Sequence, residues 1–287
     1  MTSVVPTRSP PRRDTSPLAE ATAVVTVVSL AGATRIADLA QSSPLRLLFP
    51  RVEAAEPLTA CLTNTAGGLV GGDALSVRVE AGEQARLLVM AQAAEKVYRS
   101  TGANSRIQVD LTARDHSWLE WLPQETILFE GARLERRTRL RLEGAARALV
   151  GEIVVFGRAA RGERVTCGRL RDALEVVRDG ALVWTDALDM DSDLAAALAH
   201  PAGFAGARAS ALMLCAGGTP TEIRDALRAL ESSEGVRFGA TVVGGLLLAR
   251  WLGWDVLAMR RHFGAAWATA RSLAGGLPAR LPALWHV

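Results

Sequence analysis

Alternating polar and apolar residues dominate the chain from residue 24 to about residue 185. Segments 106–111 and 138–142 show the alternation most clearly, and 75–79 repeats it with Leu75, Val77 and Val79. A period of two is typical of a strand with one buried face, and short glycine-bearing connectors separate these runs. We therefore predict about a dozen strands, arranged as stacked sheets of a β-helix-like scaffold rather than as alternating strands and helices.

Two local signals refine this picture. Asp179-Gly180 lies between two β-type runs and favours a hairpin, because this pair tolerates the positive φ of a type I′ turn. The Val/Thr-rich run from Ala23 to Leu30 indicates a strand rather than the apolar part of a secretory signal. Residues 1–20 carry prolines and arginines with little apolar pattern, so we predict a flexible tail there and a single β-rich domain over 21–287.

Helical periodicity appears only in the last third of the chain. One helix is expected near 219–232, because Thr219-Pro220-Thr221-Glu222 forms a capping box with proline at the first helical position. A second is expected near 255–274, where Gly275-Gly276 ends a stripe of bulky residues. Both helices are expected to pack on the β core. The second helix and the tail that follows it also suggest a surface for a partner protein, with aromatic contacts from Phe263, Trp267 and Trp285.

Composition excludes several classes of protein. The chain has 287 residues, of which 49% are hydrophobic, so it can bury a substantial core. Its formal charge of +3 is too small to predict nucleic-acid binding. Three widely spaced cysteines argue against a disulfide scaffold and indicate a reducing compartment, so we expect a cytoplasmic protein. The chain has no uninterrupted apolar stretch of about 18 residues, so we predict no membrane span.

The segment Asn64 to Asp73 reads Asn-Thr-Ala-Gly-Gly-Leu-Val-Gly-Gly-Asp. Four glycines in six positions do not suit a core strand, but they allow positive φ and the close approach of another chain or ligand. No Gly-Lys-Ser/Thr follows, so this is not a common nucleotide-binding loop. A tight turn is the simpler explanation for one glycine pair, whereas two pairs that end in Asp73 favour a shaped site.

Further motifs follow this segment in a fixed order. They are Gln92-Ala93-Ala94-Glu95-Lys96-Val97-Tyr98-Arg99-Ser100, Leu119-Glu120-Trp121-Leu122-Pro123-Gln124-Glu125, and Phe156-Gly157-Arg158 with Gly162-Glu163. With these motifs, residues 45–285 resemble the urease accessory proteins called UreD or UreH, and Leu281-Pro282-Ala283-Leu284-Trp285 is similar to that family's ending.

The resemblance implies a metallochaperone scaffold that does not act as an enzyme. Such a scaffold would be required for nickel insertion into the urease apoprotein. It would bridge urease to a helical accessory protein of the UreF type and a GTPase of the UreG type. We accordingly expect no catalytic residues and no tightly bound cofactor, only nickel in transit.

Candidate nickel contacts are carboxylates, because no two of the four histidines lie at metal-ligand spacing along a helix. Asp73, which closes the double-glycine segment, and Glu152, which interrupts the apolar run from Ala148 to Phe156, are predicted to lie on a transient nickel route. A buried carboxylate needs a partner or a wet cavity. A structural ion pair of Glu152 with an arginine, for example Arg99 or Arg158, is the competing interpretation.

Two other assignments rest on the acidic residues. Glu120, between Trp118 and Trp121, is expected to alternate outward into solvent. The alternative function is a β-rich carbohydrate-active hydrolase that uses paired carboxylates, since acids and tryptophans are plentiful. The single tyrosine argues against the aromatic-lined cleft that such an enzyme normally has.

Overall fold

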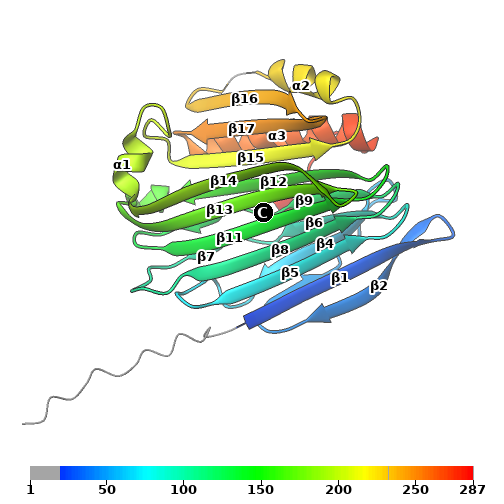
Figure 1. Cartoon of the computed structure of the whole chain (residues 1–287), viewed down its shortest axis with the longest axis horizontal. Coiled ribbons are helices and arrows are strands. Elements are labelled where there is room, and N and C mark those ends of the chain that lie inside the picture. Colours follow the sequence, from blue (N-terminus) through cyan, green and yellow to red (C-terminus); the bar gives the residue numbers. More distant parts are fainter. Residues whose placement is uncertain (1–19, 232, 287) are drawn as a thin grey trace, which may run out of the picture.

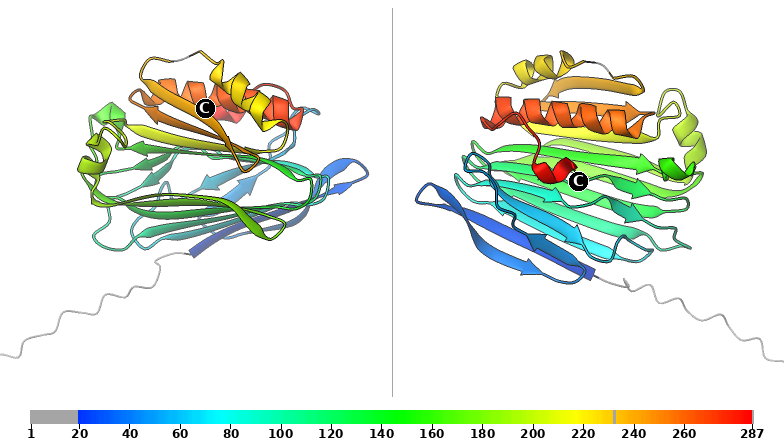
Figure 2. Two further views of the ribbon diagram at one scale, coloured as in Figure 1. Left: turned by 45° about the horizontal axis from the view of Figure 1, so that its top comes forward. Right: turned by 180° about the vertical axis from the view of Figure 1, so that it is seen from behind.

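Three layers make up the structure, which is a computed structural model that describes residues 20–231 and 233–286. Two β-sheets lie face to face, and a layer with the long helix α3 covers the outer face of the second sheet (Figures 1 and 2). The predicted mainly β architecture is confirmed. The predicted tail lies outside the described residues except for Glu20, the first residue of β1.

The first sheet has seven strands in the order β14-β13-β11-β8-β5-β1-β2. Their bounds are β1 Glu20–Leu30, β2 Ala33–Gln41, β5 Ala74–Ala81, β8 Ser105–Ala113, β11 Arg133–Leu142, β13 Cys167–Arg178 and β14 Ala181–Asp193. The Asp179-Gly180 turn joins β13 to β14 as predicted, and both of its residues have positive φ, at 48° and 82°.

The second sheet has ten strands, eight of them in the order β16-β17-β15-β12-β9-β6-β4-β3, with β10 and β7 paired beside β12. Their bounds are β3 Leu45–Leu48, β4 Leu58–Asn64, β6 Arg86–Ala91, β7 Glu95–Val97, β9 Trp118–Leu122, β10 Thr126–Leu128, β12 Arg147–Phe156, β15 Ala209–Ala216, β16 Val236–Val243 and β17 Leu246–Gly253. The described strands outnumber the predicted dozen partly because β7 and β10, at three residues each, are too short to show alternation.

The chain winds between the two sheets from β4 to β13. The successive strands of the first sheet, β5, β8, β11 and β13, are parallel neighbours, and so are β4, β6, β9 and β12 of the second. Parallel neighbours need a crossover connection, and here the crossover passes through a strand of the opposite sheet. This gives the solenoid-like arrangement.

Three α-helices complete the described fold: α1 Leu194–Ala199, α2 Pro220–Arg228 and α3 Val256–Gly275, with 3-10 turns at Ala159–Arg161 and Ala283–His286. The sequence did not indicate α1, which has only six residues. Helix α2 begins where predicted but ends at Arg228, and the Thr219 side chain makes no capping bond. Helix α3 is capped by Asp255, whose Oδ1 accepts from the Ala258 N–H at 2.9 Å. None of the described helices is long and apolar enough to cross a membrane.

The middle of the second sheet is buried on both faces. On β12, Ala148, Val150 and Val154 belong to the core between the sheets. The alternate residues Leu149, Ile153 and Val155 belong to the core beneath the helices. This double burial explains why the run from Ala148 to Phe156 is apolar without alternation.

Helix α3 lies close to β12 at Gly151. A Cβ atom at this position would lie 2.6 Å from Cζ of Phe263 and 2.8 Å from Cζ3 of Trp267. Both rings are in the interior of the chain, so they cannot move away freely. Glycine at position 151 therefore sets the distance between the sheet and the helix layer.

Gly151→Ala should lower the free energy of unfolding by about 1–3 kcal/mol, because the added methyl group forces the aromatic rings from their positions. The measurement is the midpoint of urea unfolding. Gly239→Ala is the matched control, since Gly239 lies in β16 with no atom within 4 Å of an added Cβ. Equal midpoints for the two variants would contradict this account of the packing.

Candidate functional site

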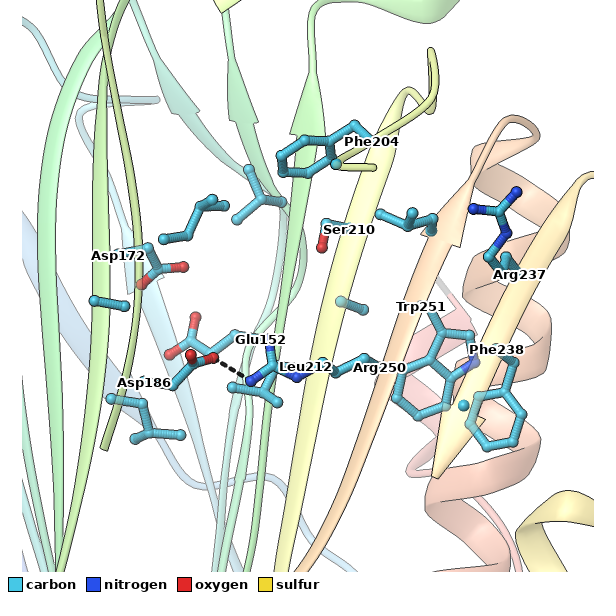
Figure 3. A pocket seen from close by; sticks show the side chains of 18 of the residues that line it. Glu152, Asp172, Asp186, Phe204, Ser210, Leu212, Arg237, Phe238, Arg250 and Trp251 are labelled. Atoms are coloured by element: carbon cyan, nitrogen blue, oxygen red, sulfur yellow. Dashed lines mark hydrogen bonds and ion pairs between the residues drawn. The ribbon is translucent and has the colours of Figure 1, made fainter. Parts of the chain in front are cut away.

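A cavity of about 480 Å³ lies between the two sheets at the end of the molecule formed by β14 to β17. Much of its wall is apolar, including Phe204 and Trp251. The side chains of Glu152, Asp172 and Asp186 also line it, and they lie on the same side of the cavity in Figure 3. We call this space the large cavity. Its acidic wall provides oxygen ligands of the kind that bind hard cations.

A second, smaller cavity of about 130 Å³ lies further along the space between the sheets. We call it the small cavity. Its polar lining includes Asn64, Glu95, Gln124, Arg136 and Glu152. Glu152 therefore lines both cavities, and its carboxylate lies where they adjoin.

Arg136 lies at this junction and connects the two sheets. It is the direct neighbour of Asp172 across β11 and β13, and it donates to that carboxylate from Nε at 2.9 Å and from its terminal nitrogen at 2.5 Å. Its other terminal nitrogen is ion-paired with Glu152 of the facing sheet. The Arg136 side chain is only 4% exposed. The competing interpretation, an ion pair of Glu152 with an arginine, is confirmed, but the partner is Arg136 of the facing sheet rather than Arg99 or Arg158.

The Glu152 carboxylate is only partly satisfied. Its Oε1 accepts from Trp121 Nε1 at 3.1 Å and from the Thr138 hydroxyl at 3.2 Å. Among the described residues its Oε2 accepts no hydrogen bond and has only the charge contact with Arg136. Burial raises the pKa of Glu152, while the charge of Arg136 acts in the opposite direction.

Glu95 is the second unusual carboxylate of the small cavity. The Asn64 amide donates to both of its oxygens at 3.1 Å. Burial raises the pKa of Glu95 to about 7, although the Asn64 bonds and the charge of Lys96 act in the opposite direction. Glu95 can therefore gain or lose a proton near neutral pH.

Asp73 lies outside both cavities, in the turn before β5. Its carboxylate accepts from the Val70 N–H at 2.9 Å. The glycines before it allow close packing: a Cβ at Gly68 would lie 2.5 Å from the Tyr98 ring, and one at Gly71 would lie 2.1 Å from the Ser100 hydroxyl. The structure thus does not bring Asp73 into contact with Glu152. The described residues contain no group of three or more His, Cys, Asp or Glu side chains arranged to hold a metal ion.

Glu120 is fully buried, so the prediction that it faces solvent is wrong. It lies on the helix-facing side of β9, where it accepts from Trp118 Nε1 at 2.9 Å and Trp267 Nε1 at 3.0 Å. The buried Arg271 donates to it from Nε at 3.1 Å. The outward face of β9 meets α3 instead of water, which the alternation alone did not reveal.

The predicted partner-binding aromatics lie inside the chain. Phe263, Trp267 and Trp285 are 1%, 0% and 2% exposed, and they pack in the core beneath the helices. Their bulk is explained by this packing. The opposite side of α3 is accessible, with Leu257 58% exposed at the start of the helix. This accessible side of α3 borders a groove of about 570 Å³ between α3 and the C-terminal tail.

Sequence reasoning did not identify Arg136 and Asp172. Arg136 breaks the apolar series Leu134, Leu140 and Leu142 on the inward face of β11. A charged residue at an inward position was the available signal, but arginines at neighbouring outward positions obscured it.

Comparisons with known proteins establish the family. The sequence model of the UreD urease accessory protein family matches residues 19–286. A protein of Magnetococcus marinus named "Urease accessory protein UreD" is 46% identical over 89% of this chain and 90% of its own length. Proteins of the same name from Methylobacterium sp. (strain 4-46) and Azorhizobium caulinodans are 42% and 40% identical, over 98% and 82% of this chain and 98% and 86% of their own lengths. The chain belongs to the UreD urease accessory protein family.

Glu95→Gln should stabilise the protein increasingly as the pH rises from about 4.5 to 7. The pKa of Glu95 is about 7 in the folded chain, compared with an ordinary value of 4.5, so its ionisation favours unfolding over this interval. The gain above pH 7 should be on the order of 2 kcal/mol. Urea unfolding at several pH values measures it. The exposed Glu83 supplies the control: a gain of similar size and pH dependence in Glu83→Gln would show that burial is not the cause.

Proposed function

We propose that this chain is a non-catalytic scaffold in urease maturation, through which nickel reaches the urease apoprotein in the cytoplasm. Its match to the UreD family over residues 19–286 is the observation that carries this proposal. The scaffold binds the urease apoprotein, a helical accessory protein of the UreF type and, through the latter, a GTPase of the UreG type.

The two internal cavities are suited to a metal in transit. Both are lined by Glu152, and oxygen ligands without imidazole or thiolate hold nickel loosely enough for release. Asp73 belongs to the same proposal as a contact outside the cavities. The pKa of Glu95 is raised mainly by burial, and the charge of Asp73 makes a smaller contribution in the same direction.

The arrangement of the carboxylates favours this role over the hydrolase alternative. A glycosidase needs its two carboxyl groups on either side of a scissile bond. Here both Glu152 and Asp172 contact the guanidinium of Arg136, which fills the space between them. The pair is therefore engaged with a cation rather than open to a sugar.

The accessible side of α3 is the proposed contact for the helical accessory protein. Leu257, Arg261, Ala265 and Ala268 border the groove between α3 and the tail. An amphipathic helix laid in such a groove contacts it through residues on one face. Phe263 and Trp267 then support this surface from beneath, whereas Trp285 borders the groove itself although it is only 2% exposed.

Glu152→Gln should leave the complex with the two accessory partners intact but lower the nickel content of urease matured with it. Glutamine keeps the size of the side chain and can still accept from Trp121 and Thr138, but it loses the ligand charge and the ion pair with Arg136, which keeps Asp172 as its partner. The measurements are co-purification with the partners and metal analysis of the urease. Asp73→Asn is assayed in the same way and should lower the nickel content by less, because Asp73 does not line the cavities.

The matched control is Glu120→Gln, a second buried carboxylate on the opposite face of the same sheet. It should cost stability, on the order of 3 kcal/mol, because its buried arginine partner loses the charge that neutralises it. Nickel content per assembled complex should stay at the wild-type value for this control. Full nickel loading with Glu152→Gln and Asp73→Asn combined would exclude the proposed route.

Leu257→Asp should weaken binding of the helical accessory protein by at least about tenfold, since a charge replaces an apolar contact residue at the interface. Pull-down with purified partner measures the loss. Leu182→Asp is the control, because Leu182 is 60% exposed at the β13–β14 hairpin, away from the groove. Equal binding by the two variants would remove α3 from the proposed interface.

A further inference from the structure

We propose that Arg136 is an internal gate, a displaceable cation that closes a divalent-cation site between Glu152 and Asp172. The inference rests on the proposed function for the identity of the cation in the cell. Displacement of the guanidinium opens the site and joins the two cavities.

The position of the guanidinium is the first argument. It is held by Asp172 at 2.5 and 2.9 Å on one side and is paired with Glu152 on the other. Both carboxylates line the large cavity, whereas Arg136 and Glu152 line the small one. A cation that passes from one cavity to the other along these carboxylates meets the guanidinium at their junction.

The charges are the second argument. Two carboxylates and one guanidinium leave this cluster with one net negative charge. A divalent cation between the same carboxylates neutralises both of them, and it would be repelled by a guanidinium that stayed in place. Binding of the metal and retention of Arg136 between Glu152 and Asp172 are therefore mutually exclusive.

The third argument is that two buried polar atoms near the junction of the cavities make no hydrogen bond in the described part of the chain. Glu152 Oε2 accepts no hydrogen bond among the described residues, although the residue is only 7% exposed. Gln124, which lines the small cavity and is 4% exposed, likewise has an amide nitrogen without a partner in the described part of the chain. Buried polar atoms without partners are costly. Glu152 Oε2 has only its ion pair with Arg136, and a divalent cation would give this oxygen a ligand bond instead.

The small cavity also provides an alternative position for the displaced side chain. Arg136 borders this cavity, and Glu95 lies on its wall. Rotation of the long arginine side chain into the cavity exchanges the carboxylate of Asp172 for that of Glu95. The guanidinium thus remains near a negative charge while the metal occupies the position it left.

The test measures Ni²⁺ binding to the purified full-length protein by equilibrium dialysis. Arg136→Gln should bind Ni²⁺ at least about tenfold more tightly than the wild type, because the competing charge is gone. Adding Glu152→Gln to this variant should return the affinity to the wild-type value. Arg139→Gln is the matched control: Arg139 lies on the same strand but pairs with Glu175 on the outer face, and its loss should leave nickel binding unchanged.

An Arg136→Gln variant without tighter binding, or one whose gain survives removal of Glu152, would overturn the gate. If Arg136→Gln does not fold without metal, Arg136→Gln/Asp172→Asn replaces it. This variant retains Glu152 without the competing guanidinium and should still bind Ni²⁺ more tightly than the wild type. Absence of that gain overturns the gate as well.

Failure of the gate can be distinguished from failure of the nickel route. If Glu152→Gln lowers the nickel content of urease while Arg136→Gln gains no affinity, the route stands and the gate is wrong. If Arg136→Gln gains affinity through Glu152 while Glu152→Gln still gives fully loaded urease, the gate stands as a property of this chain and the route is wrong.

Discussion

The burial of both faces of the second sheet is the constraint on which the rest of the structure depends. On its central strands β9 and β12 nearly every side chain is buried toward one of two cores, so a carboxylate there needs a partner. The sheet nevertheless carries one buried carboxylate toward each core, Glu120 toward the helices and Glu152 toward the first sheet. Glu120 stabilises the contact with the helix layer, whereas Glu152 borders the two cavities of the proposed function.

Glu120 is fully compensated, and its partners hold the C-terminal part of the chain in place. Arg271, which pairs with it, also donates to the carbonyl oxygens of Pro278 and Arg280 and to Glu56. Trp267 contributes a further bond from the same helix. One charge on β9 thus fixes α3, the tail and the β3–β4 connection together. The Glu120 carboxylate therefore has no free lone pair that faces a cavity and could bind another group.

The sequence predicted features that depend on short stretches of chain. The Asp179-Gly180 hairpin and the start of α2 at Pro220 follow from local conformational preferences. The orientation of Glu120 and the partner of Glu152 did not follow. Alternation tells which residues share a face, but what covers that face is decided by tertiary packing: Arg271, which is 151 residues from Glu120, packs against it from α3, and Arg136 faces Glu152 from the opposite sheet.

The location of the large cavity follows from where the solenoid stops. From β4 to β13 each strand is covered by the next coil, and core residues fill the space between the sheets except at the small cavity. After β13 the chain turns back in antiparallel pairs, with β14 ending the first sheet and β15, β17 and β16 extending the second. The two extensions are joined across the gap by the ion pair of Asp186 with Arg250 at 2.6 Å (Figure 3), and Phe204 and Trp251 are among the residues that line the cavity. Because Asp172 and Glu152 lie on the last regular coil, their carboxylates border this space. The end of the repeat, rather than any local motif, therefore gives these buried carboxylates access to a cavity.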